Sequence, residues 1–218
     1  MRLSLILLAG CLAPVAAFAQ TADHAPSTLS SSAKLEHGKG ENWNYRKAGL
    51  NLGAYRSILV EPTVVYSGPD AQFKDIPAAD RAKFANILTQ SLRTELAQSP
   101  GLASKAGPGV LRIQLTLLGA DKTMGGVSTV THVMPVGLAM NAVKSLAGKK
   151  GSMTGSALIA VELKDSKTGE LLAAAVRRES PDALNIDATL STAETVKAIG
   201  KDVGQAIAKR LNAAMHRK

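Results

Sequence analysis

The clearest pattern in the chain is an alternation of apolar and polar residues from Val110 to Gly119. Large apolar residues occupy every second position from Leu111 to Leu117, and the positions between them are polar. Successive side chains of a β-strand point to opposite faces, so this period of two predicts a half-buried strand.

Residues 155–164 predict another strand, with Ala157, Ile159, Val161 and Leu163 on one face, and residues 171–178 are its expected partner. They are separated by the polar stretch Asp165–Glu170, in which Gly169 can adopt a positive φ. This arrangement predicts an antiparallel hairpin. Residues 56–66 are rich in β-branched residues and predict another strand, in which Pro62 imposes a bend or an edge position.

Two long segments instead carry apolar residues at helical spacing. The first spans 77–98 and is stopped by Ser99-Pro100-Gly101. The second opens with a capping box at Ser191–Glu194 and continues with a stripe expected to be buried. That stripe consists of Val196, Ile199, Val203, Ile207 and Leu211.

Between the two groups of strands the pattern is weaker. Residues 127–134 predict a further strand, and 135–149 form either a short apolar helix or an irregular crossing. Strands outnumber helices and one hairpin is antiparallel. The fold class predicted is therefore α+β, with a mixed, largely antiparallel sheet of about five strands and two long helices packed on one face.

The first 19 residues have the pattern of a secretory signal peptide. Arg2 precedes an apolar run, and Ala17-Phe18-Ala19 is a small-x-small site with cleavage expected between Ala19 and Gln20. The run is too short to span a bilayer as a helix, and no later stretch is long and apolar enough to do so. The mature protein is expected in the periplasm.

A competing interpretation lies in the same segment. Leu8-Ala9-Gly10-Cys11 fits the lipobox of bacterial lipoproteins, and Cys11 is the only cysteine of the chain. The residues after it are apolar, whereas a lipoprotein usually has a polar tether there. Both soluble export and a membrane anchor through Cys11 therefore stay open.

Residues 20–42 are rich in Ser, Thr, Gly, Pro and His, with Leu29 and Leu35 as the only large apolar residues. Such a composition offers little apolar surface to offset the entropy of ordering, so a disordered linker is predicted. A single α+β domain is then expected over residues 43–218.

The amino-acid composition argues against several kinds of binding site. A single cysteine excludes an intramolecular disulfide, and four histidines without paired cysteines argue against a structural zinc site. Aromatic residues make up only 3%, which leaves little for base or sugar stacking. No cofactor is expected, and export separates the chain from nucleic acid.

No catalytic motif is found. Gly151–Gly155 has the glycines of a serine elbow, but the serine stands one place early, and His132 has no second histidine or cysteine nearby. The scattered carboxylates that could meet in space are Asp121, Asp165 and Glu170. The last two flank the predicted hairpin turn, where stabilising the turn is the simpler role. The chain is therefore predicted not to be an enzyme.

The net charge is +9, and the cations gather in two places. One group is Lys144, Lys149 and Lys150, and the other is Lys209, Arg210, Arg217 and Lys218. Cations at a helix end complement the helix dipole, and the functional alternative is contact with an anionic envelope surface. The apolar stretch from Met134 to Leu146 is interpreted as a buried connection or a contact helix for a membrane surface or a partner.

Several short segments, taken in order, resemble a bacterial envelope family known as domain-of-unknown-function family 3313. They are Trp43–Lys47, Tyr55–Pro62, the helix 80–98, Gly107–Leu111 and Asp165–Ala174. The resemblance implies an exported protein of Gram-negative bacteria, often a lipoprotein, with no assigned reaction and no active-site residues.

These observations lead to one hypothesis and two alternatives. The first is a non-catalytic cell-envelope accessory protein that binds a protein partner or an anionic envelope surface. The alternatives are a periplasmic carrier or sensor of a small ligand or lipid, held between sheet and helices, and an enzyme with an unrecognised site. The sequence does not indicate the oligomeric state.

Overall fold

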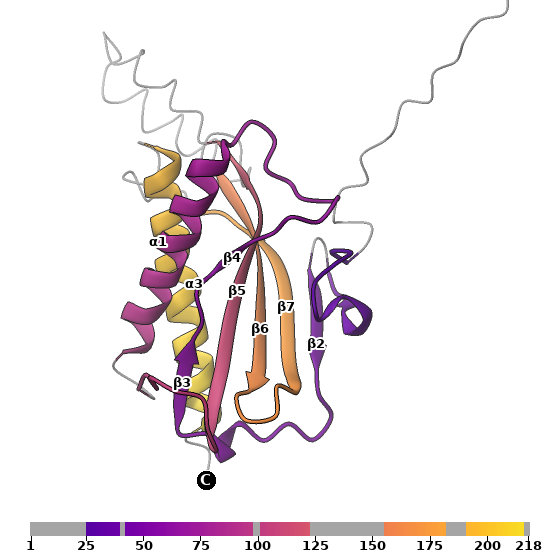
Figure 1. The fold of residues 1–218 in the computed structure, drawn as a ribbon, viewed down its shortest axis with the longest axis vertical. Helices are drawn as coiled ribbons and strands as arrows, with labels where there is room; N and C mark the ends of the chain where they lie inside the picture. The colour runs from indigo at the N-terminus through magenta and orange to yellow at the C-terminus, as the bar shows by residue number, and fades with distance from the viewer. Residues whose placement is uncertain (1–24, 40–41, 98–100, 123–154, 182–190, 216–218) are drawn as a thin grey trace, which may run out of the picture.

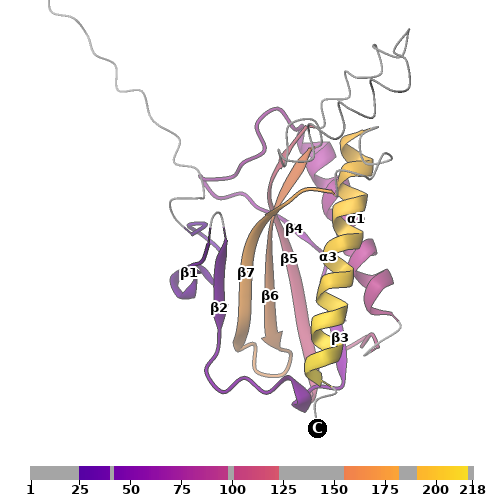
Figure 2. The ribbon, with the colours of Figure 1, turned by 180° about the vertical axis from the view of Figure 1, so that it is seen from behind.

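The computed structural model describes residues 25–39, 42–97, 101–122, 155–181 and 191–215. Within them, seven strands form one sheet and two long helices lie side by side against one of its faces, as Figures 1 and 2 show from opposite sides. The strands are β1 (Glu36–His37), β2 (Trp43–Arg46), β3 (Ser57–Val60), β4 (Val64–Val65), β5 (Val110–Asp121), β6 (Ser156–Asp165) and β7 (Leu171–Glu179). The helices are α1 (Ala78–Leu96) and α3 (Thr192–Met215), with short 3-10 turns η1 (Ser32–Lys34) and η2 (Leu52–Ala54).

The strand order is β1-β2-β7-β6-β5-β3, with β4 pairing β5 beyond the end of β3. The β1-β2, β2-β7, β7-β6 and β6-β5 pairs are antiparallel, and β3 and β4 run parallel to β5. The predicted α+β class is confirmed. The strand count exceeds the prediction because the segment 56–66 divides into two strands around Pro62 and because β1 and β2 join the sheet.

The alternation that predicts β5 corresponds to burial under the helices. Leu111, Ile113, Leu115 and Leu117 are each at most 2% exposed and belong to the main core. Leu118 lies on the opposite face, as the alternation requires, and the register shift between Leu117 and Gly119 then brings Ala120 back to the core under the helices. Glycine is required at 119, since a Cβ there would lie 2.5 Å from the Gln72 carbonyl oxygen.

The predicted local signals of the hairpin and the second helix are confirmed. Gly169 has a φ of 75° in the β6–β7 turn. The Ser191 Oγ accepts a hydrogen bond of 3.2 Å from the backbone N–H of Glu194, which is the expected cap at the start of α3. Val196, Ile199 and Leu211 of the predicted stripe are buried.

The face of the sheet away from the helices is covered in part by the N-terminal segment. Leu35 is 8% exposed and packs in a second core cluster with Tyr66, Leu118 and Leu158. The prediction of a disordered linker over 20–42 therefore differs from the structure at 25–39, and the folded domain begins earlier than residue 43.

Side-chain hydrogen bonds explain why this segment is ordered. Ser27 Oγ donates to Asp70 at 2.9 Å, and Thr28 Oγ1 is 3.0 Å from the Tyr66 hydroxyl. Ser30 Oγ donates to both carboxylate oxygens of Glu162, at 2.8 and 2.9 Å. The polar residues that suggested a linker are thus the residues that attach it to the sheet.

Some predictions fall outside the described residues. These are the signal peptide with its cleavage site at Ala19 and Gln20, the lipobox at Cys11, the strand 127–134 and the segment 135–149.

Candidate functional site

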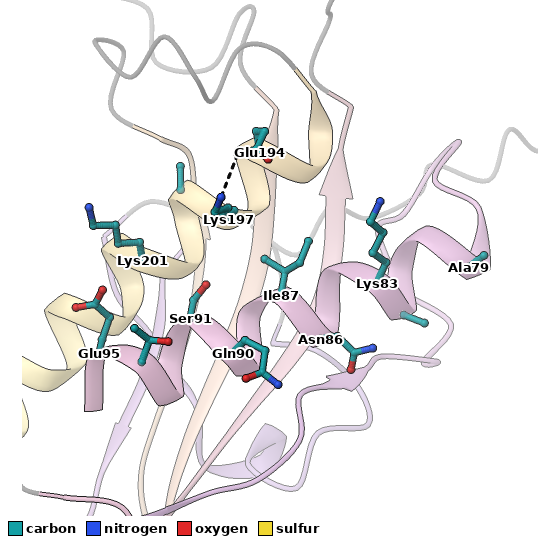
Figure 3. Close-up of a pocket in the computed structure, with 13 residues that line it drawn as sticks. Ala79, Lys83, Asn86, Ile87, Gln90, Ser91, Glu95, Glu194, Lys197 and Lys201 are labelled. Atoms are coloured by element: carbon teal, nitrogen blue, oxygen red, sulfur yellow. Dashed lines mark ion pairs between the residues drawn. The ribbon is translucent and has the colours of Figure 1, made fainter. Parts of the chain in front are cut away.

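A groove of about 930 Å³ lies between the two helices, on the side away from the sheet. We call it the helix groove. Its lining is shown in Figure 3 and consists of Ala79, Ala82, Lys83, Asn86, Ile87, Gln90, Ser91, Thr94, Glu95, Glu194, Lys197, Ala198 and Lys201.

Two glycines on α3 set how closely the helices approach below this groove. A Cβ at Gly200 would lie 2.8 Å from Ser91 Oγ, and a Cβ at Gly204 would lie 2.9 Å from Glu95 Cγ. Both glycines are buried and stand one helical turn apart. The backbone of α3 therefore rests directly on α1, and the longer side chains around this contact form the groove walls.

Three lysines stand on the walls of the helix groove, Lys83 on α1 and Lys197 and Lys201 on α3 (Figure 3). Lys197 lies 3.7 Å from Glu194 in an exposed ion pair of the kind that contributes little to stability. Lys83 and Lys201 are exposed and form no ion pair within the described residues. The groove thus presents cations that are available to a bound anion.

The helices as a whole carry an excess of positive charge. Together α1 and α3 contain seven Lys and Arg residues and four Asp and Glu residues.

On the opposite face of the sheet, three cations are paired with carboxylates in the described structure. Arg112 lies 3.2 Å from Glu61, Lys164 lies 3.0 Å from Glu162, and Arg178 lies 3.0 Å from Asp121.

A smaller groove of about 370 Å³ lies between α3 and the strands β6 and β7. We call it the sheet groove. Its residues are Ile159, Val161, Leu163, Ala173, Ala174, Ala175, Arg177, Glu179, Val203, Ala206, Ile207, Arg210 and Leu211. Most of these are aliphatic, and the two arginines and Glu179 are its charged residues.

The basic residues predicted from the sequence are only partly placed. Lys209 and Arg210 are exposed on α3, and Arg210 lines the sheet groove. Lys144, Lys149, Lys150, Arg217 and Lys218 lie outside the described residues.

Sequence reasoning missed Lys83, Lys197, Lys201 and Arg177. The spacing of Lys197 and Lys201 by four residues was a usable signal, because residues i and i+4 share one face of a helix. Their proximity to Lys83 depends on the packing of α1 on α3, which the pattern along the chain does not contain.

The carboxylates singled out in the sequence have nearby partners. Asp121 lies 2.9 Å from Lys74 and 3.0 Å from Arg178, and accepts a hydrogen bond of 2.7 Å from Ser156. Burial works to raise the pKa of Asp121, but the hydrogen bonds from Ser156 and Lys74 and the two positive charges outweigh it, so this pKa is lowered.

Asp165 stabilises the hairpin turn, as expected, whereas the Glu170 side chain pairs with a residue outside the turn. Asp165 accepts hydrogen bonds from the backbone N–H groups of Thr168 and Lys167, at 2.8 and 3.0 Å, which closes the hairpin turn. The Thr168 N–H is the largest influence that lowers the pKa of Asp165. Glu170 lies 2.6 Å from Lys47.

Two features that the described residues lack bear on the type of site. No group of three or more His, Cys, Asp or Glu side chains is placed to hold a metal ion there. No helix among these residues combines the length and the apolar character needed to cross a bilayer.

The sequence of residues 25–207 matches the model of a family described as protein of unknown function, DUF3313. The chain belongs to this family. The match begins at residue 25, where the described segment against the sheet also begins. No curated protein matches the chain.

Solved structures show distant similarity. The PelC dodecamer from Paraburkholderia phytofirmans is 10% identical, with 74% of this chain and 96% of that chain covered and a TM-score of 0.36. A predicted lipoprotein from Caulobacter crescentus is 12% identical, with 75% and 90% covered and a TM-score of 0.32. A predicted neuraminyllactose-binding hemagglutinin homolog from Helicobacter pylori is 12% identical, with 74% and 85% covered and a TM-score of 0.35. At these identities and TM-scores the similarity bears on neither function nor assembly.

Proposed function

We propose that this DUF3313 protein is a non-catalytic, exported protein of the bacterial envelope that binds an anionic membrane surface through the face formed by α1 and α3. The observation that carries the proposal is the helix groove, where Lys83 and Lys201 project without a carboxylate partner in the described structure and Lys197 has only an exposed one.

The charge on this face favours binding to an anionic surface. A Lys or Arg near an anionic lipid surface contributes about 1 kcal/mol, so the three lysines of the helix groove contribute about 3 kcal/mol, or roughly a hundredfold in affinity. The exposed Lys209 adds a further positive charge to α3. The attraction is electrostatic and is weakened by salt.

A binding role rather than a reaction is favoured by the contents of the grooves. The helix groove is lined by amides, hydroxyls, alanines and lysines, and of its two carboxylates Glu194 lies against Lys197. General acid–base or nucleophilic catalysis needs a nucleophile, a base and an orienting group within hydrogen-bond reach of one another. The lining of neither groove includes a histidine or a cysteine.

The envelope location rests on the N-terminal sequence. The apolar run and the Ala17-Phe18-Ala19 site support export, with cleavage before Gln20, and Cys11 offers lipid attachment as the alternative. In either case the domain from residue 25 onward would meet anionic phospholipid headgroups outside the cytoplasm.

The test is sedimentation of the mature protein with lipid vesicles. We expect binding to vesicles that contain phosphatidylglycerol, no binding to vesicles of phosphatidylcholine alone, and release of the bound protein by moderate salt. Equal sedimentation with both types of vesicle, or none with either, would contradict the proposal. Recovery of a stoichiometric protein partner in the absence of vesicle binding would assign the helix face to a protein instead.

A further inference from the structure

We propose that the sheet groove is a binding site for an amphiphile with a single acyl chain and an anionic head group, such as a free fatty acid. This goes beyond the proposed surface binding, which uses the other side of α3. The argument rests on the shape of the groove, its apolar lining and the arginine at one end of it.

The shape follows from small residues on β7. In the β6–β7 register, Ala173 lies opposite Leu163 and Ala175 lies opposite Val161. These alanines have no side-chain atoms beyond Cβ, whereas the aliphatic residues of β6 and α3 beside them are larger. A trough is therefore left along β7, between the sheet and α3.

The walls of the trough are alkyl groups. Ile159, Val161 and Leu163 come from β6, and Val203, Ile207 and Leu211 come from α3. These side chains have no hydrogen-bond donors or acceptors, so a polar ligand would lose its hydrogen bonds to water here without replacement. The lining therefore fits an alkyl chain.

Arg177 lies near one end of the trough, two positions before Glu179 on the same face of β7. It lies opposite Ile159 in the register, two positions from Ala175 on the same face of β7. Its Nη2 is 3.4 Å from Asn44 Oδ1, while its Nε is buried and has no hydrogen-bond partner. The Arg177 side chain is part of the groove lining, and an anionic head group at this end would form a charge-assisted hydrogen bond with its guanidinium.

The other charges agree with an anionic ligand. Arg210 on α3 is exposed and adds a second positive charge to the lining. Glu179 is the carboxylate of the lining, and it has an interaction partner of its own. Charge complementarity thus favours a negatively charged head group over a neutral or positive one.

The volume indicates one chain. At about 370 Å³ the groove lies near the lower end of ligand pockets. A phospholipid with two chains would need a wider opening between β7 and α3, whereas one alkyl chain can lie along the two alanines.

The test uses the mature protein in solution without vesicles, below the micellar concentration of each ligand. Palmitate and hexadecanol compete with a fluorescent fatty acid, which gives a dissociation constant for each. We expect palmitate to displace the probe, and hexadecanol to bind about tenfold more weakly because it lacks the charge that Arg177 recognises.

Two variants locate the site. Ala175→Leu fills the trough and should weaken palmitate binding more than tenfold, whereas Ala213→Leu, at an exposed position of α3, should leave it unchanged. Arg177→Gln should weaken the binding of palmitate about tenfold and leave the affinity for hexadecanol nearly unchanged. Arg56→Gln, at an exposed arginine, is its control.

The outcomes separate this inference from the proposed function. Absence of palmitate binding to the wild type, or equal binding to wild type and both groove variants, would overturn the inference and leave the vesicle result untouched. If Ala175→Leu fails to fold, Arg177→Gln still tests the inference. The inference requires that this variant lower the affinity for palmitate relative to that for hexadecanol. A wild-type dimer that Ala175→Leu converts to a monomer would assign the groove to a second copy of the chain and overturn the inference.

Discussion

Gly200 on α3 lies so close to Ser91 on α1 that a Cβ added to the glycine would be 2.8 Å from the serine Oγ and 2.9 Å from its Cβ. Real side chains do not approach to such distances, so this position holds the two helices at their observed separation. The helix groove and its three lysines depend on that separation.

Replacing this glycine by a large residue should force the helices apart. We expect Gly200→Leu to lower the free energy of unfolding by about 2 kcal/mol, because the cost of overpacking exceeds the gain in helix propensity of about 1 kcal/mol. Urea denaturation measures the change. Gln205→Leu, at an exposed position of the same helix, should change stability by less than about 0.5 kcal/mol, and an equal loss in both variants would contradict this role of Gly200.

Glu162 should hold the N-terminal segment on the sheet. The residue is 5% exposed, and its carboxylate accepts hydrogen bonds from Ser30 and Lys164. We expect Glu162→Gln to cost about 2 kcal/mol and to increase amide hydrogen exchange in residues 25–35. Glu61→Gln, which removes the partly exposed pair with Arg112, should cost far less and leave exchange in 25–35 unchanged.

The same carboxylate gives a pH dependence of known sign. Burial works to raise the pKa of Glu162, but the neighbouring serine hydroxyls and the Lys164 ammonium outweigh it, and this pKa is lowered. A lowered pKa in the folded state contributes stability above the ordinary pKa of glutamate, and that stability is lost as the pH falls through the folded value. The difference in unfolding free energy between wild type and Glu162→Gln should therefore shrink on acidification. A difference that grows would contradict the assignment.

The Tyr55 hydroxyl should lose its proton at a higher pH than an ordinary tyrosine does. Burial, then the hydrogen bond of 3.0 Å that its hydroxyl donates to Asp165, and then the charges of Asp165 and Glu170 raise the pKa of Tyr55 to about 12. Its contribution to stability is complete below its ordinary pKa of 10.0 and is lost as the pH rises towards about 12. Tyrosinate absorbance, taken as the difference between wild type and Tyr55→Phe, reports this step. We expect Asp165→Asn to move it to lower pH, because asparagine lacks the negative charge, and no movement would exclude that charge as a cause.

The parts of the fold that the sequence predicts are those with local causes. The alternation around Leu115, the turn at Gly169 and the cap at Ser191 each involve residues a few positions apart, and each has its expected structure. The segment 25–39 has too few apolar residues to predict order. It is held by partners such as Asp70 and Glu162, which lie 43 and 132 residues away in the chain.

The two grooves could not be predicted from the sequence either, because their residues are far apart in the chain. Arg177, Ala175 and Ile207 come from a strand and a helix whose relative placement is fixed by tertiary packing. The sequence pattern groups Lys209 and Arg210 near the carboxy-terminal end of the chain, and both are exposed on α3 before its last turn. The pattern does not show that Lys83, Lys197 and Lys201 gather across α1 and α3.

The order of residues 25–39 also changes the reach expected of a lipid anchor. If Cys11 is lipidated, only residues 12–24 separate it from the packed segment, and a fully extended chain of that length spans at most about 45 Å. Intact mass spectrometry of the protein exported from a Gram-negative host decides the N-terminus. We expect a chain beginning at Gln20, and a lipid-modified chain beginning at Cys11 would contradict this expectation.

The central claim, that the lysines of the helix groove bind an anionic surface, is tested most directly by a matched pair of triple variants. In one, Lys83, Lys197 and Lys201 become glutamine, and in the other the exposed Lys39, Lys105 and Lys167 do, so both lose the same charge. Sedimentation with phosphatidylglycerol vesicles should show affinity reduced roughly a hundredfold in the first variant and much less in the second. Equal loss of affinity in the two variants would show that net charge alone drives the binding and would contradict a site at the helix groove.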